Sequence, residues 1–145
     1  MRLAVATLFG IGRVPFMPGT LGSIAGAGIS WWLAGQPRLQ AAACAAVILL
    51  ALWSAGSAER ILGKKDPSCI VIDEVAGMMV AVLFLPAAGA AYGVGFVLFR
   101  FLDIVKPPPL RWFQRLPGSW GILLDDLLAG LMVRSILCAA QAWMR

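Results

Sequence analysis

The chain has 145 residues, of which 61% are hydrophobic and 13% are charged, and its mean hydropathy is +0.87. Soluble domains have about 45–50% apolar and about 25% charged residues, so this composition excludes a disordered chain and disfavours an ordinary water-soluble enzyme. The three cysteines have no paired spacing and the chain has no histidine, which excludes a disulfide framework and a typical zinc site. We therefore expect one small domain, residues 1–145, that is either embedded in a membrane or has a very apolar core and sits on a membrane.

The charges favour a lipid surface as the partner. Twelve Lys and Arg residues and seven acidic residues give a net charge of +5. Because there is no basic run and no aromatic platform among polar residues, we expect no nucleic acid partner; anionic lipid headgroups explain the basic balance better. No protein partner is predicted. The acidic residues are few enough to name: Glu59, Asp66, Asp73, Glu74, Asp103, Asp125 and Asp126.

The amino-terminal end leads from an apolar segment, residues 3–12, into a Pro/Gly motif. The segment has no small-x-small cleavage site before polar sequence, so we expect it to be retained rather than removed as a signal peptide. The motif Pro18-Gly19-Thr20-Leu21-Gly22-Ser23 then opens a helix whose free N–H groups and two hydroxyls, of Thr20 and Ser23, suit an anion. It lacks the Gly-Lys-Ser/Thr ending of a Walker loop, and a simple capped helix is the alternative.

Long uncharged stretches follow, at residues 14–37, 39–58 and 75–99. Each has about the 20 residues that cross a hydrocarbon core, and a last apolar segment, 121–144, carries Asp125, Asp126 and Arg134. Small-residue pairs in these stretches are typical of close contacts between membrane helices. The pairs are Gly22-xxx-Gly26 and Gly89-xxx-Gly93.

The third stretch contains a turn signal, Pro86-Ala87-Ala88-Gly89, near its middle. As one span it would separate segments 59–74 and 100–115, whereas a hairpin of two short helices, about 75–85 and 90–102, returns both segments to one side. The positive-inside rule favours the hairpin. We therefore expect an all-α, compact multi-helix bundle embedded in the membrane, with its acidic residues gathered at the cytoplasmic face. Nine cations then share that face, and Arg38 and Arg145 lie on the other: Arg2, Arg13, Arg60, Lys64, Lys65, Arg100, Lys106, Arg111 and Arg115.

Two acidic pairs have similar surroundings, in residues 70–77 and 122–130. Each pair, Asp73-Glu74 or Asp125-Asp126, enters an apolar helix and is followed within about a turn by glycine. Placement at a helix N-terminus explains one acid simply, but not two pairs. Together with Asp103, the pairs suit a hard metal ion. Because adjacent residues on a helix point about 100° apart, we expect one member of each pair to bind the metal and the other to orient a water or a neighbour.

Cationic residues accompany these acids. Arg100, Asp103 and Lys106 recur at i, i+3 and i+6 on one helical stripe, which the run Pro107-Pro108-Pro109 ends. Arginine and lysine suit a phosphate, although such a cluster could also simply contact lipid headgroups. Two further arginines follow at i, i+4 on the next short segment: Arg111 and Arg115.

Four sequence blocks spread over residues 18–130 occur in a fixed order. They are Pro18-Gly19-Thr20-x-Gly22-Ser23, Asp66-x3-Ile70-Val71-x-Asp73-Glu74-x2-Gly77, Arg100-x2-Asp103-x2-Lys106-Pro107-x-Pro109-x-Arg111 and Gly121-Ile122-x2-Asp125-Asp126-x2-Ala129-Gly130. Together they resemble the phosphatidylglycerophosphatase A family. The resemblance implies a Mg²⁺-dependent, multi-pass enzyme of the bacterial cytoplasmic (inner) membrane that converts phosphatidylglycerophosphate to phosphatidylglycerol. It also implies an all-helical fold with one helix packed among several others, and an acid at position 114, where this chain has Gln114.

Other phosphatase mechanisms lack their residues here. There is no Cys-x5-Arg motif, no histidine and no Asp-x-Asp motif, which leaves attack by metal-activated water. A small membrane cation or proton transporter that uses its carboxylates, or a non-catalytic membrane subunit, remains the alternative. For the phosphatase, we predict a metal site of Asp73, Glu74, Asp125 and Asp126, with Asp103 as a further ligand or the base for the water. We predict that Asp73, Asp103, Lys106 and Asp126 are catalytic, that Arg100, Lys106 and Arg111 bind the phosphate with Thr20 and Ser23 at its edge, and that Asp66 and Glu59 support the ligands.

Overall fold

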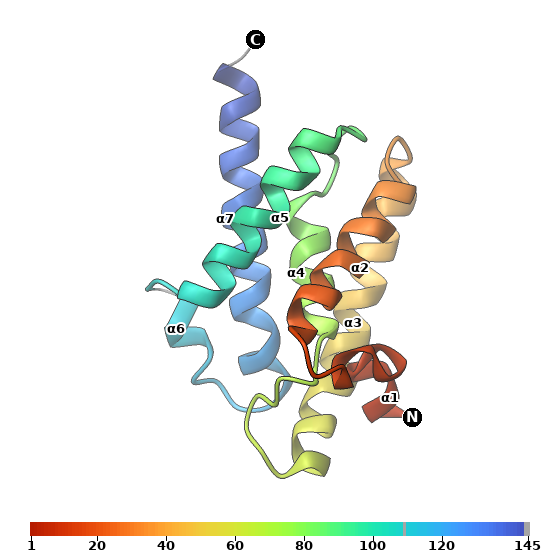
Figure 1. Ribbon diagram of the computed structural model, residues 1–145, viewed down its shortest axis with the longest axis vertical. Coiled ribbons are helices and arrows are strands. Elements are labelled where there is room, and N and C mark those ends of the chain that lie inside the picture. The colour runs from red at the N-terminus through yellow and green to blue at the C-terminus, as the bar shows by residue number, and fades with distance from the viewer. Residues whose placement is uncertain (109, 144–145) are drawn as a thin grey trace.

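The computed structural model describes residues 1–108 and 110–143, and this part of the chain is helical with no strand. The prediction of an all-α fold is therefore confirmed. Predictions that involve Pro109, Met144 and Arg145 lie outside the described residues. In chain order the elements are α1 (Arg2–Ala6), the 3-10 helix η1 (Leu8–Arg13), α2 (Pro18–Trp32), α3 (Pro37–Leu62), α4 (Ile72–Ala81), α5 (Gly89–Val105), α6 (Leu110–Phe113) and α7 (Ser119–Trp143) (Figure 1).

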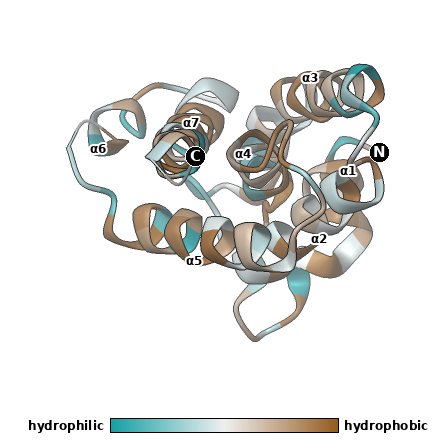
Figure 2. Ribbon diagram, turned by 90° about the horizontal axis from the view of Figure 1, so that it is seen from above, coloured by the Kyte–Doolittle hydropathy of each residue, from teal (hydrophilic) through white to brown (hydrophobic). Residues whose placement is uncertain are grey.

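The short helix α4 forms the centre of the bundle. Nine of its ten residues are buried, and it contacts the long helices α2, α3, α5 and α7. Figure 2 shows these four helices around it. A helix that is apolar on nearly all sides is stable only when other elements surround it. This arrangement agrees with the fold that the family resemblance implies.

The uncharged stretch 75–99 forms a helical hairpin, as predicted. Helix α4 ends at Ala81 and α5 begins at Gly89, with Pro86 in the turn between them. Helix α5 then runs back toward the end of the bundle where α4 begins (Figure 1). It ends at Val105, because the next residue, Lys106, has a left-handed backbone (φ 44°) and the prolines that follow cannot continue the helix. The acidic start of α4 and the charged end of α5 therefore lie at the same end of the molecule.

Glycines let α2 lie directly against the backbone of α4. A Cβ at Gly22 would come 2.8 Å from a carbonyl oxygen just before α4, and one at Gly26 would come 2.6 Å from that of Val75. The predicted packing role of this pair is confirmed. The same prediction for Gly89 and Gly93 is wrong, because a Cβ at either position would meet nothing within 4 Å. Both glycines are exposed near the start of α5, where no other helix approaches them.

The outside of the bundle is largely apolar. In the described part of the chain, α3 is the one helix that is long and apolar enough to cross a membrane, with a mean hydropathy of 1.9. Helix α2 has 15 residues and is therefore about 22 Å long, which is shorter than a hydrocarbon core of about 30 Å. Helix α5, at the outside of the bundle, is also largely hydrophobic, as its brown colour in Figure 2 shows. Large exposed side chains include Trp32 (82%), Leu49 (65%), Val97 (64%) and Ile104 (66%).

Candidate metal and phosphate site

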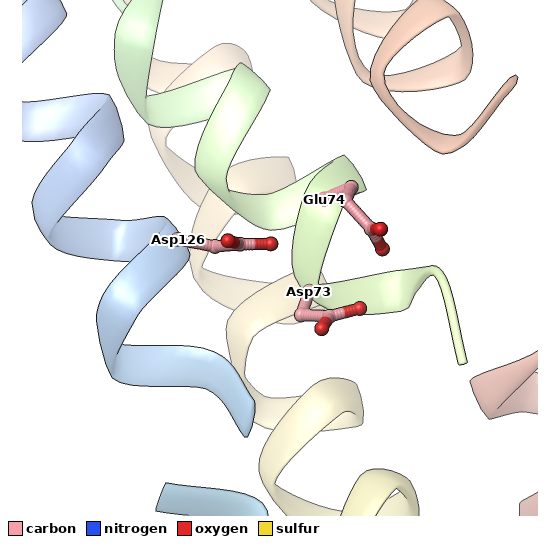
Figure 3. Close-up of side chains that lie close together, drawn as sticks. All are labelled: Asp73, Glu74 and Asp126. Carbon is pink, nitrogen blue, oxygen red and sulfur yellow. The ribbon is translucent and has the colours of Figure 1, made fainter. Parts of the chain in front are cut away.

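Three carboxylates from two helices lie close together. Asp73 and Glu74 are in the first turn of α4, and Asp126 projects toward them from α7 (Figure 3). One oxygen from each side chain lies within 4.8 Å of the oxygens offered by the other two. Asp73 is 6% exposed and Asp126 is 3% exposed. We call these three residues the acidic centre.

A pair of glycines sets the distance between α4 and α7. Gly77 follows Asp73 by four residues and Gly130 follows Asp126 by four, so each glycine shares a helix face with an acid of the centre. A Cβ at Gly77 would lie 2.6 Å from the carbonyl oxygen of Asp126, and a Cβ at Gly130 would meet the carbonyl oxygen of Gly77. The similarity between the two acidic segments therefore has a structural reason. Their glycines allow the close contact that brings the acids together.

The helix dipole explains the position of the first acidic pair only. Asp73 and Glu74 lie in the first turn of α4, where the dipole favours negative charge. Helix α7 begins at Ser119 and has no acid in its first turn, so Asp126 lies about two turns inside the helix. A buried carboxylate at that position needs another source of stabilisation, such as a cation.

The electrostatics of the centre fit a hard divalent cation. Burial raises the pKa of Asp73 well above its usual value, and the carboxylates of Glu74 and Asp126 raise it further. Burial also raises the pKa of Glu74 to about 7, although its hydrogen bond with Asp73 acts in the opposite direction. Within residues 1–108 and 110–143, no Lys or Arg forms an ion pair with these three carboxylates, and Asp73 Oδ1 and Glu74 Oε2 are buried without a hydrogen-bond partner. Clustered carboxylate oxygens with free lone pairs are the ligands that Mg²⁺ and similar ions prefer.

Ion pairs border the acidic centre and link α5 to α7. Arg100 Nη1 donates to Asp103 Oδ2 at 2.6 Å. Lys106 Nζ lies 3.7 Å from Asp103 Oδ1 and donates to Asp125 Oδ2 at 2.6 Å. Burial lowers the pKa of Lys106, but the hydrogen bond to Asp125 and the surrounding carboxylates outweigh burial, so the pKa is raised and the ammonium stays charged.

The two acidic pairs differ in their arrangement. In the second pair, Asp126 joins the acidic centre and Asp125 contacts Lys106, so the two carboxylates have different neighbours, as their adjacent positions on one helix led us to expect. In the first pair, Asp73 and Glu74 both offer an oxygen to the centre, which differs from that expectation. Both residues lie in the first turn of α4, and Glu74 points away from α7 toward the first turn of α2 (Figure 3).

The first turn of α2 borders the acidic centre. A Cβ at Gly19 would meet Glu74 Oε1 and would lie 3.0 Å from Arg100 Nη1. Arg100 also donates from Nη1 to Ser23 Oγ at 3.5 Å, and Ser23 Oγ donates to the carbonyl oxygen of Gly19 at 2.9 Å. Among the described residues, Thr20 Oγ1 and Arg100 Nε are buried without a partner. Glycine at position 19 thus lets the side chains of Glu74 and Arg100 lie against the first turn of α2. The hydroxyl and guanidinium donors gathered there suit phosphate oxygens.

Arg111 lies apart from three of the other predicted phosphate ligands, Arg100, Thr20 and Ser23. Together with Lys106 it lines a cavity of about 610 Å³ between α6, the end of α5 and the loop that precedes α4. Its Nη2 donates to the carbonyl oxygen of Val105 at 3.4 Å. Arg115 and Lys65 also line this cavity. From the sequence, Lys65 is expected on the same face as these arginines but is assigned no site, because it is far from them along the chain.

Asp66 links the loop before α4 to its neighbours. Its backbone N–H donates to Glu59 Oε1 at 3.0 Å, and its Oδ2 accepts from Gln114 Nε2 at 3.0 Å. The family resemblance leads us to expect an acid at position 114. A carboxylate there would face that of Asp66, so the amide of Gln114 replaces a repulsion with a hydrogen bond.

An acidic centre suited to a cation, with arginine and lysine beside it on an all-helical scaffold, fits a phosphatase that hydrolyses a phosphomonoester. The comparison with protein families leads to the same class. A family model described as Phosphatidylglycerophosphatase A matches residues 4–141. The chain therefore belongs to the phosphatidylglycerophosphatase A family.

Individual relatives agree with the family. The chain is 35% identical to phosphatidylglycerophosphatase A of Escherichia coli, over 92% of this chain and 79% of that protein. It is 32% identical to phosphatidylglycerophosphatase A of Haemophilus influenzae, over 97% of this chain and 88% of that protein. A Bacteroides thetaiotaomicron protein with the provisional name phosphatidylinositol-3-phosphatase is 35% identical, over 99% of this chain and 94% of that protein. No solved structure matches the chain.

Proposed function

We propose that this protein hydrolyses the terminal phosphate of phosphatidylglycerophosphate, with Mg²⁺ as the cofactor, and yields phosphatidylglycerol and inorganic phosphate. The observation that carries the proposal is the acidic centre with Arg100 and Lys106 at its border. Carboxylates without a cationic partner favour a metal ion, and a metal ion together with these cations favours a phosphate. Two relatives named phosphatidylglycerophosphatase A support the choice of substrate.

The residues of the site have different proposed roles. A divalent cation held by Asp73, Glu74 and Asp126 would neutralise charge on the phosphate oxygens and lower the pKa of the attacking water. Arg100 orients the phosphate through its Nε, which has no partner among the described residues, and the first turn of α2 lies beside the Arg100 guanidinium. Because catalysis of phosphoryl transfer is mainly positioning and charge stabilisation, these fixed donors contribute directly to the rate.

Asp103 is the proposed base. Arg100 and Lys106 both bind its carboxylate, which holds it at the border of the acidic centre. In the reaction the water oxygen bonds to phosphorus, the bond from phosphorus to the glycerol oxygen breaks, and Asp103 takes the proton of the water. Lys106 stays charged and stabilises the negative charge on the leaving oxygen. That oxygen receives the proton from Asp103 by way of water, which restores the Asp103 carboxylate.

The proposed location is the bacterial cytoplasmic membrane, with several spans and the acidic centre at the cytoplasmic boundary, outside the hydrocarbon core. Helix α3 is the candidate span, and the exposed apolar side chains of α5 support further contact with lipid. The end of the helical bundle that carries the acids also carries Lys65 and Arg111, in line with the positive-inside rule. We propose that residues 1–145 form one domain.

Neutralising one acid of the centre tests the function. Asp126→Asn and Asp73→Asn should each lower phosphate release from phosphatidylglycerophosphate in detergent micelles by about 10²–10³-fold at saturating Mg²⁺. Membrane insertion and helix content by circular dichroism should be unchanged. Near-normal turnover in both variants would contradict the assignment. Ion flux through liposomes without phosphate release would support a transporter instead.

A further inference from the structure

We propose that the cavity lined by Lys65, Lys106, Arg111 and Arg115 binds the second, diester phosphate of a lipid that carries two phosphates. We call it the basic cavity. The inference rests on the proposed function and adds how the headgroup is recognised. The monoester phosphate lies at the acidic centre, and the diester phosphate that joins the glycerol to the lipid lies in the basic cavity.

The basic cavity is built from three segments that are far apart in the chain. Lys65 comes from the loop before α4, Lys106 from the end of α5, and Arg111 and Arg115 from α6 and the turn after it; the cavity volume is about 610 Å³. In the part of the chain that the structure describes, Lys65, Arg111 and Arg115 form no ion pair with a carboxylate within 4.0 Å. These three cations outnumber the one carboxylate in the cavity wall, that of Asp66, so the concave space has a positive potential that favours an anion.

The single carboxylate in the cavity wall is already engaged. Asp66 Oδ2 accepts a hydrogen bond from Gln114 Nε2 at 3.0 Å, and both residues line the cavity. The amide at position 114 therefore keeps a second negative charge out of the wall. An acid there would lower the positive charge around the cavity by one unit and would weaken the binding of an anion.

Lys106 joins the basic cavity to the acidic centre. It lines the cavity, and its Nζ donates at 2.6 Å to Asp125, the neighbour of Asp126 on α7. One side chain thus stands between the two sites. A headgroup in which a glycerol links two phosphates would present two anions at short range, and this pair of adjacent sites is complementary to it.

The chemistry of each site suits a different phosphate. A monoester phosphate carries up to two negative charges and has to be hydrolysed, so it belongs where carboxylates can hold a metal ion. A diester carries one negative charge and has to stay intact. The basic cavity offers cations without a cluster of carboxylates among the described residues, so it can hold an anion without supplying a metal that would activate water.

The test compares one-phosphate and two-phosphate lipids. The double variant Lys65→Gln, Arg115→Gln and the control Lys64→Gln are assayed at saturating Mg²⁺ on phosphatidylglycerophosphate and on phosphatidic acid of the same chain length. We expect the double variant to lower kcat/KM for phosphatidylglycerophosphate by at least about tenfold, because it loses hydrogen bonds to a charged phosphate. It should change kcat/KM for phosphatidic acid by less than about twofold. The control should change neither. Lys64 is an exposed neighbour that does not line the basic cavity.

A soluble diester gives a second readout that does not depend on turnover of phosphatidic acid. Glycerophosphoglycerol, which has a diester but no monoester phosphate, should inhibit the wild type competitively and should lose this inhibition in the double variant. Equal losses on both lipids, together with weaker binding to phosphatidylglycerol vesicles, would overturn the inference and identify the cavity as a membrane contact. Unchanged kinetics and inhibition would also overturn it. A wild type that releases phosphate from neither lipid would instead refute the proposed function itself.

Discussion

Gly77→Ala should disable the acidic centre without touching any of its side chains. The new Cβ would lie 2.6 Å from the carbonyl oxygen of Asp126 and 2.7 Å from the ring of Phe99. Ordinary contact begins at 3.4 Å, so the backbone of α7 must retreat by about 0.8 Å at Asp126, because packed interiors leave no free space. Mg²⁺ demands near-ideal geometry at about 2.0–2.1 Å, and an error of about 1 Å at a reacting centre costs about 10²-fold in rate.

The effect on stability should be smaller than the effect on activity. Overpacking costs about 1–3 kcal/mol, and alanine regains about 1 kcal/mol of helix propensity relative to glycine. We therefore expect a helical protein that melts at a moderately lower temperature in detergent, releases phosphate about 10²-fold more slowly and binds Mg²⁺ more weakly by isothermal titration calorimetry.

The matched control is Gly28→Ala. Gly28 is also inside a helix, α2, but a Cβ there would meet nothing within 4 Å. This variant should keep wild-type activity and Mg²⁺ affinity and should be slightly more stable. If Gly77→Ala behaves like Gly28→Ala in both assays, the close contact between α4 and α7 does not set the geometry of the acidic centre.

Three further predictions concern the metal, the pH and the ion pair on Lys106. EDTA should abolish phosphate release and added Mg²⁺ should restore it, whereas release that persists in EDTA would argue against a metal at the acidic centre. Burial raises the pKa of Glu74 from 4.5 to about 7, so between these pH values the metal-free folded protein holds a proton that the unfolded chain has lost. The free energy of unfolding of the metal-free protein should then fall as the pH rises through that window. The Mg²⁺ affinity measured by calorimetry should rise by up to about tenfold from pH 6 to 7, because the ligand has to lose its proton. A Mg²⁺ affinity that does not change with pH would contradict the prediction. Lys106→Met leaves Asp125 buried without its partner and should lower the free energy of unfolding by about 1–3 kcal/mol. The control Lys64→Met, at an exposed position, should lower it by less than about 0.5 kcal/mol. Equal stabilities of the two variants would refute the importance of the ion pair between Lys106 and Asp125.

Much of the architecture follows from local sequence. Apolar stretches of helical length, and the Pro and Gly residues that end them, predict the long helices and the hairpin around Pro86, since these signals act within a few residues of where they stand. The acidic residues are also visible from the sequence alone, because an ionised side chain in so apolar a chain is costly without a partner. The stripe of Arg100, Asp103 and Lys106 is predicted for the same reason, since residues three apart on one helix are neighbours.

Only the tertiary structure decides which of these residues meet. Asp125 and Asp126 are adjacent in the chain, and the rotation of α7 against α4 turns one toward Lys106 and the other toward Asp73. Two glycine pairs with the same spacing differ because Gly22 and Gly26 face the backbone of α4, whereas a Cβ at Gly89 or Gly93 would meet no described atom within 4 Å. Lys65 joins the arginines of α6 only after the hairpin has folded back. Spacing along the chain fixes which residues share a helix face, but the distance between side chains on different helices depends on how closely the backbones can approach, and that is a property of the packed bundle.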